Sequence, residues 1–96
     1  MITFAPTFGG GQTVAPGTSS AAITLAKNNK SVLLTNLGTE TVYVRLSPAA
    51  VAATIADYPV LASSQVTISK AAGSLHVSYL TASGTGSLHV MGGEGA

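Results

Sequence analysis

Apolar and polar residues alternate in short runs along most of the chain after residue 20. Six runs show this alternation, at residues 23–25, 32–35, 42–46, 66–68, 75–79 and 88–90. A period of two with many β-branched residues is typical of strands that bury one face. In the third run, Val42 and Val44 share the buried face, and Arg45 faces the other way. The pattern therefore predicts an all-β protein.

Turn-forming residues separate these runs. Asn36-Leu37-Gly38-Thr39 is typical of a hairpin turn with Gly38 at positive φ, which would fold residues 31–36 back onto 41–46. Ser83-Gly84-Thr85-Gly86 predicts the same connection between 75–81 and 87–91. Short antiparallel strands at this spacing predict a single β-sandwich or jelly roll of seven to eight strands.

The composition divides the chain into three parts. Residues 1–20 are rich in Gly and Pro and predict an extended arm, with Phe4 and Phe8 as apolar anchors onto a neighbour or the chain's own body. Residues 21–91 form the predicted sandwich, and 92–96 a short tail. The Ala-rich segment 49–56 is predicted to be an irregular excursion, with a short helix as the alternative.

Charge is unusually sparse. Charged residues make up 7% of the chain, against about 25% in typical soluble domains. A surface so poor in charge favours association, so we expect partner subunits to cover much of it and the protein to form a homo-oligomer. The alternative is a Ser/Thr-rich β-protein that stays monomeric. Four dispersed cations form no basic stripe, which argues against a nucleic-acid partner.

Targeting signals are also missing from the sequence. No segment approaches the roughly 20 apolar residues of a membrane-spanning helix, so we expect no membrane partner. The first residues lack the basic and apolar regions of a signal peptide, which predicts synthesis in a cytoplasm without secretion.

The residues that carry chemistry are few and scattered. The three acidic residues, Glu40, Asp57 and Glu94, fall in different predicted loops, and there is no cysteine. We therefore expect no enzymatic activity and no cofactor. In the predicted hairpin, His76 and His89 would point to one face. Two imidazoles are too few for a zinc site, so we predict no metal site and interpret both as polar surface residues. Around a threefold axis, the alternative is that one of them meets its symmetry mates.

Five residues are candidates for an assembly interface: Phe4, Phe8, Arg45, His76 and His89. Arg45 has two interpretations, an ion pair at a subunit interface or an edge charge that discourages aggregation.

A resemblance to a known family adds to this picture. An apolar strand at 32–35 leads into Asn36-Leu37-Gly38-Thr39 and then into a Val/Tyr/Arg strand at 42–45. Together with residues 53–62 and the Gly/Ser/Thr-rich ending, this order resembles small structural proteins of tailed bacteriophages. The resemblance spans about residues 31–95. It implies a head decoration (cement) or head-fibre subunit, often trimeric, and no catalytic residues.

The expected function is accordingly that of a virion protein, most simply a capsid decoration subunit. It would bind the major capsid protein or other virion subunits on the outside of the head and bridge neighbouring subunits. The alternatives are another virion component, such as a head–tail connector, tail or fibre protein, and a module that binds a host receptor or glycan.

Overall fold

The computed structural model describes residues 5–6, 11–25, 30–49, 51–69 and 73–94, and these contain strands and no helix. In chain order the strands are β1 (Ala5–Pro6), β2 (Gln12–Val14), β3 (Ala21–Thr24), β4 (Ser31–Asn36), β5 (Val42–Ser47), β6 (Tyr58–Val60), β7 (Gln65–Ser69), β8 (His76–Thr81) and β9 (Leu88–Glu94). The prediction of an all-β protein is confirmed.

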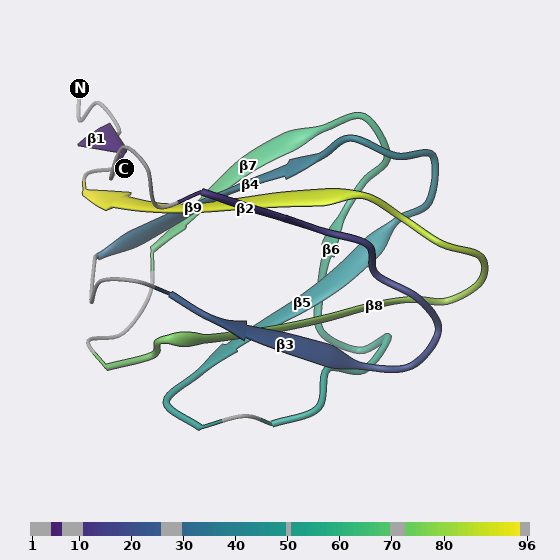
Figure 1. The fold of residues 1–96 in the computed structure, drawn as a ribbon, viewed down its shortest axis with the longest axis horizontal. Helices are drawn as coiled ribbons and strands as arrows, with labels where there is room; N and C mark the ends of the chain where they lie inside the picture. Colours follow the sequence, from purple (N-terminus) through teal and green to yellow (C-terminus); the bar gives the residue numbers. More distant parts are fainter. Residues whose placement is uncertain (1–4, 7–10, 26–29, 50, 70–72, 95–96) are drawn as a thin grey trace.

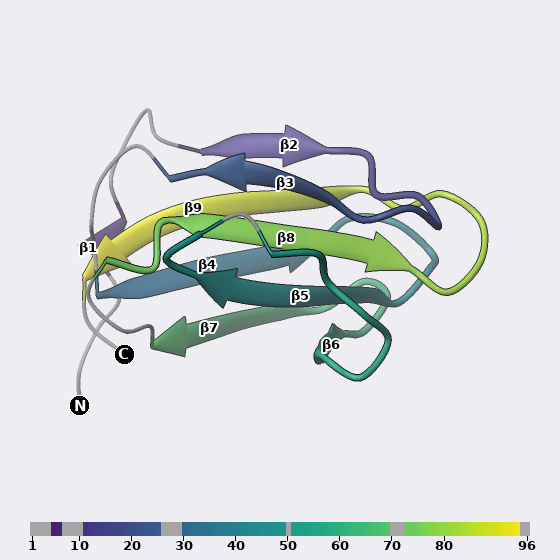
Figure 2. The same ribbon diagram turned by 90° about the horizontal axis from the view of Figure 1, so that it is seen from below.

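The strands form two antiparallel sheets that pack face to face (Figures 1 and 2). Sheet A has the order β1-β9-β4-β7, and β2 pairs with β9 on the same side as β1. Sheet B has the order β3-β8-β5-β6. The predicted β-sandwich is therefore confirmed.

The pairing of strands β2 to β9 follows one simple rule. The first of them pairs with the last, the second with the next to last, and so inward: β2 with β9, β3 with β8, β4 with β7 and β5 with β6. This is a long antiparallel hairpin, and it is rolled up so that β4 also meets β9 and β5 also meets β8. The arrangement is a jelly roll.

The core lies between the sheets and is made of aliphatic side chains and one aromatic side chain, that of Tyr79. Sheet A contributes Val32, Leu34, Leu88 and Val90, and sheet B contributes Val42, Val44, Val60, Val77 and Tyr79. Apart from Val60, these are the alternating positions that the sequence pattern assigned to the buried face. Burial of such side chains drives the sheets together, because removing apolar surface from water is the main favourable term in folding.

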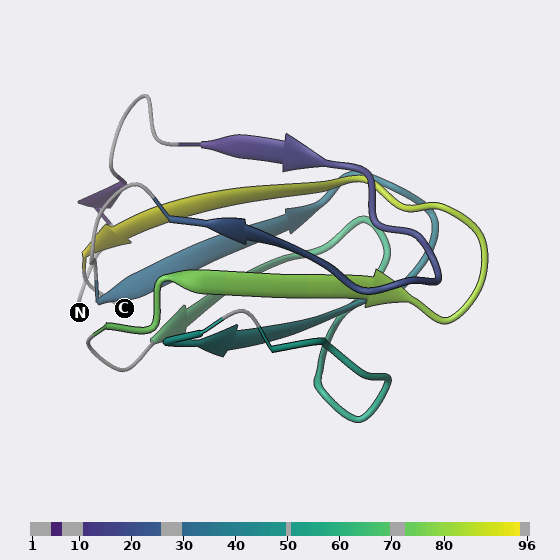
Figure 3. The same ribbon diagram turned by 60° about the horizontal axis from the view of Figure 1, so that its bottom comes forward.

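Both predicted hairpins are wrong. Strand β4 belongs to sheet A and β5 to sheet B, so the 37–41 segment crosses between the sheets instead of folding one strand onto the next. The same holds for β8 and β9, which residues 82–87 connect. Figure 3 shows both links crossing at the same end of the sandwich, opposite β1 and the C-terminal end of β9.

Gly38 does not have the predicted positive φ, which Gly73 and Gly84 show instead. Space is the constraint at Gly38. A Cβ atom there would lie 3.0 Å from the backbone nitrogen of Ser87, so the β4–β5 link passes close against the β8–β9 link. The Leu37 N–H donates to the Ser87 carbonyl at 2.8 Å and holds the two links together.

Strands extend beyond the 21–91 range predicted for the sandwich. Within the predicted arm, β1 and β2 pair with β9, and Pro16 is fully buried, its carbonyl accepting the Gly86 N–H at 2.8 Å. At the other end, β9 continues to Glu94. The described part of 49–56 is irregular, as predicted, and contains no helix.

Candidate interaction surface

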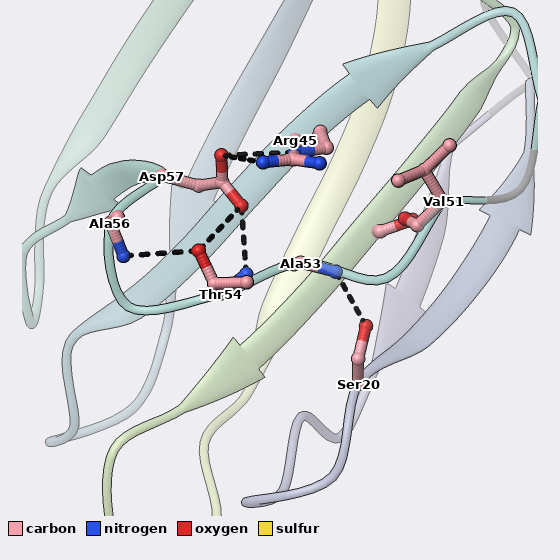
Figure 4. Close-up of polar contacts among 8 residues, drawn as sticks. Ser20, Arg45, Val51, Ala53, Thr54, Ala56 and Asp57 are labelled. Carbon is pink, nitrogen blue, oxygen red and sulfur yellow. Dashed lines mark hydrogen bonds and ion pairs between the residues drawn. The ribbon is translucent and has the colours of Figure 1, made fainter.

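The loop between β5 and β6 lies across the outer face of sheet B. Figure 4 shows it passing in front of β5 and β8 towards Ser20, which precedes β3. The Ser78 hydroxyl on β8 donates to the Val51 carbonyl at 2.5 Å, and the Ala53 N–H donates to the Ser20 hydroxyl at 2.8 Å. Ala53 is buried against the sheet. The small side chains of this Ala-rich segment let its backbone approach the sheet closely.

An ion pair fixes the return of the loop to the sheet (Figure 4). Asp57 Oδ1 accepts hydrogen bonds from Nε of Arg45 and lies 3.0 Å from Nη2 of the same side chain. Its Oδ2 accepts the Thr54 N–H at 2.7 Å and the Thr54 hydroxyl at 3.4 Å. The Asp57 carboxylate therefore closes the turn 54–57 and ties it to β5.

The surroundings of Asp57 favour its charged form. Partial burial raises the pKa of the Asp57 carboxyl, but the N–H of Thr54 and the charge and hydrogen bond of Arg45 outweigh it and hold the pKa below its ordinary value. The carboxylate is therefore ionised at neutral pH, which keeps the ion pair intact.

Large apolar side chains are exposed beside this anchored loop. Among the described residues, those that are large, apolar and exposed are Leu37, Val51, Ile55, Tyr58 and Leu61, each at least 42% exposed. All of them belong to β6, to the loops that flank it or to the β4–β5 link, and we call this set the β6 surface. Four of the five come from one stretch of the chain, residues 51–61, and exposed apolar residues that gather in one region mark interaction sites. Because the loop is held by polar contacts, its apolar side chains are presented in one arrangement.

The two candidate histidines lie on opposite outer faces of the sandwich. His76 is on β8 in sheet B and His89 on β9 in sheet A, and each alternates with core residues. The expectation that both share a face is therefore wrong, because it rested on a hairpin that does not form. His89 Nδ1 lies 2.9 Å from the Thr13 hydroxyl on β2. No cluster of three or more His, Asp or Glu residues suited to a metal occurs among the described residues.

The other three candidates have different outcomes. Phe4 and Phe8 lie outside the described residues. Arg45 forms its ion pair with Asp57 of the same chain, and β5 is an inner strand between β8 and β6. Strand β6 pairs with β5 only at Val42–Val44, so Arg45 lies just past the paired part, and both interpretations of Arg45 stay predictions.

Comparison with known proteins gives no further assignment: no protein-family model, no curated protein and no solved structure matches the chain. Within the described residues, no helix is long and apolar enough to cross a membrane.

The β6 surface was not predicted from the sequence. Ile55 and Tyr58 stand in a segment without a period, so the pattern could not show which side chains face solvent. A usable signal was the spacing of Thr54 and Asp57, three residues apart in the sequence. Asp and Thr side chains often form hydrogen bonds with nearby backbone groups and so stabilise tight turns.

Proposed function

We propose that the protein is a non-catalytic assembly subunit, and specifically a structural virion protein that decorates the outside of a capsid. The observation that carries the proposal is the β6 surface, a set of exposed apolar side chains of which two, Val51 and Ile55, lie on the loop that polar contacts hold against sheet B. The virion role is supported by the sequence resemblance to phage structural proteins. The jelly roll is compatible with it, but it serves viral capsid proteins, lectins and cupins alike.

The proposed mechanism is adhesive. The apolar side chains of the β6 surface would be buried against a shell subunit, and burial contributes about 25 cal/mol for each Å² removed from water. Few charges oppose this desolvation, because charged residues are only 7% of the chain. The trimer that the resemblance implies stays a prediction.

The experiment has two stages. Particles purified from a culture that produces the protein should contain it in many copies, and cryo-electron microscopy should place it on the outer shell. Recovery only in the particle-free fraction, or a position in the tail, would contradict the decoration role. Rebinding to particles stripped of the protein should then be measured for variants.

Ile55→Asp places a charge on the β6 surface and should weaken rebinding at least tenfold, since a buried unpaired charge is strongly unfavourable. Thr13→Asp, exposed on β2 in sheet A and away from β6, is the matched control and should rebind normally. Equal rebinding by both variants would mean that another surface makes the contact.

A glycan array with the isolated chain tests the glycan-binding alternative. It should show no selective binding, and a selective hit would favour that alternative.

A further inference from the structure

We propose that β7 is a self-pairing edge, through which two copies of the chain join sheet A to sheet A in antiparallel fashion about a twofold axis at Thr67. This inference goes beyond the proposed function and does not depend on a virion role. Strand β7 ends sheet A, and no described strand lies on its outer side. Its sequence, Gln-Val-Thr-Ile-Ser, has no charge and no proline.

The other edge strands are shorter, and two of them are partly blocked. Strand β6 has three residues with Pro59 in the middle, which lacks the N–H that a pairing strand would need. On β3, the carbonyl of Thr24 already accepts the Gln12 side-chain amide at 3.1 Å. Strand β2 has three residues. With five residues, β7 is the longest open edge among the described strands.

The register with β4 shows which backbone groups β7 presents. The Asn36 N–H donates to the Ser64 carbonyl at 2.8 Å, so these two residues form a hydrogen-bonded pair that continues the β4–β7 ladder. Such pairs alternate along an antiparallel ladder. Val66 and Ile68, opposite Leu34 and Val32, are therefore bonded to β4. The N–H and carbonyl of Thr67 point outward, away from β4.

A second copy is the partner that this edge fits. In an antiparallel pair centred on Thr67, the two Thr67 residues face each other and exchange two backbone hydrogen bonds. Val66 of each copy then lies opposite Ile68 of the other, on the core side, where both side chains are only half-buried. Thr–Thr pairs and pairs of β-branched residues are favourable across strands. Because the strand carries no charge, pairing with its own copy meets no like-charge repulsion.

The first test removes the outward hydrogen bonds. Sedimentation equilibrium of the full chain at micromolar concentrations should give twice the chain mass of 9.5 kDa, or an even multiple of it where further contacts form. Thr67→Pro removes one N–H from each copy and should raise the dissociation constant about tenfold or more. It should barely change the melting temperature, because that N–H does not bond to β4. Val66→Pro is the matched variant and should lower the melting temperature strongly.

The second test uses charge. Thr67→Lys places two like charges opposite each other and should weaken the dimer, and Thr67→Glu should do the same. An equimolar mixture of the two variants should restore it, because Lys then faces Glu. Thr24→Lys, on the edge strand β3, should leave the mass unchanged.

Three results would overturn the pairing: a wild-type monomer, an odd-numbered oligomer such as the trimer, or Thr67 variants with unchanged mass. The measurements need no particle, so their failure is distinguishable from failure of the decoration role, which is measured by rebinding.

Discussion

Two amide side chains cross the gap between the sheets, one on each side of the sandwich. On the β6/β7 side, Asn36 of β4 is 1% exposed, and its Nδ2 donates to the Val60 carbonyl at 2.9 Å and to the Glu40 carbonyl at 2.8 Å. Its Oδ1 accepts the Gly38 N–H at 3.0 Å. On the β2/β3 side, Gln12 makes one such bond, to the Thr24 carbonyl, in contact with solvent.

The comparison shows that the same kind of hydrogen bond contributes more to stability when it is buried than when it is exposed. A buried amide that loses its partners leaves polar groups with neither protein nor water, whereas an exposed amide is replaced by water. Asn36 also joins β4, β6 and the β4–β5 link, so three segments depend on it. Buried hydrogen bonds therefore hold the β6/β7 side of the sandwich together. The exposed β6 surface and the open β7 edge both lie on this side.

The largest expected effect comes from Asn36→Ala. Three hydrogen bonds are lost in a buried place, and two carbonyls and one N–H lose a partner, so the free energy of unfolding should fall by about 2–4 kcal/mol. Urea unfolding measures it. A loss below about 1 kcal/mol would mean that water replaces the amide, and the two sides would then be alike.

Gly38→Val should have the next largest effect and lower the free energy of unfolding by about 1–3 kcal/mol. The new Cβ would press on the backbone of Ser87 and disturb the hydrogen bond from the Gly38 N–H to Asn36. Gly17→Val is the control. It lies on the β2–β3 link, and a Cβ there meets no atom within 4 Å. Equal melting temperatures for the two variants would show that the two links have room to separate.

The sequence pattern predicted which residues face the core, since strand alternation is a local property. Val32 and Leu34 are buried and Leu33 is not, whichever strands lie beside β4. Pairing is not local. The turn signal at Asn36 was correct as a turn, because its side chain accepts the N–H two residues on, as in an Asx-turn. The same geometry serves a hairpin or a crossing between sheets, and only the packing of β5 against β8 decides between them.

The candidate site was harder to predict for the same reason. Arg45 was recognised as outward-facing, but its partner, Asp57, reaches it through a loop without periodicity. The two histidines were placed on one face by a pairing that the fold does not use. Residue spacing alone cannot show where a loop folds back onto the sheet.

Asp57→Asn tests the ion pair that anchors the β5–β6 loop. It should lower the free energy of unfolding at neutral pH by less than about 1 kcal/mol, as is usual for solvent-accessible ion pairs. The folded-state pKa of Asp57 is below its ordinary value of 3.8, so the unfolded chain binds more protons near that pH. Its contribution is therefore present above pH 3.8 and is lost as the pH falls through the folded-state pKa. The variant should lose less stability between about pH 6 and about pH 3 than the wild type. Parallel pH profiles would show that the carboxylate contributes nothing.

Gln12→Ala should have the smallest effect, below about 0.5–1 kcal/mol, because water can take the place of its amide at the Thr24 carbonyl. Strand β2 keeps its pairing with β9, and the buried Pro16 still holds the β2–β3 link, so the sandwich should unfold in one transition. Hydrogen exchange at β3 is the sensitive measurement: it should rise in this variant while exchange at β4 stays the same. If Gln12→Ala instead costs as much as Asn36→Ala, the β2/β3 side is fixed as firmly as the other. The contrast between a buried and an exposed bridge would then not explain how the two sides of the jelly roll are held together.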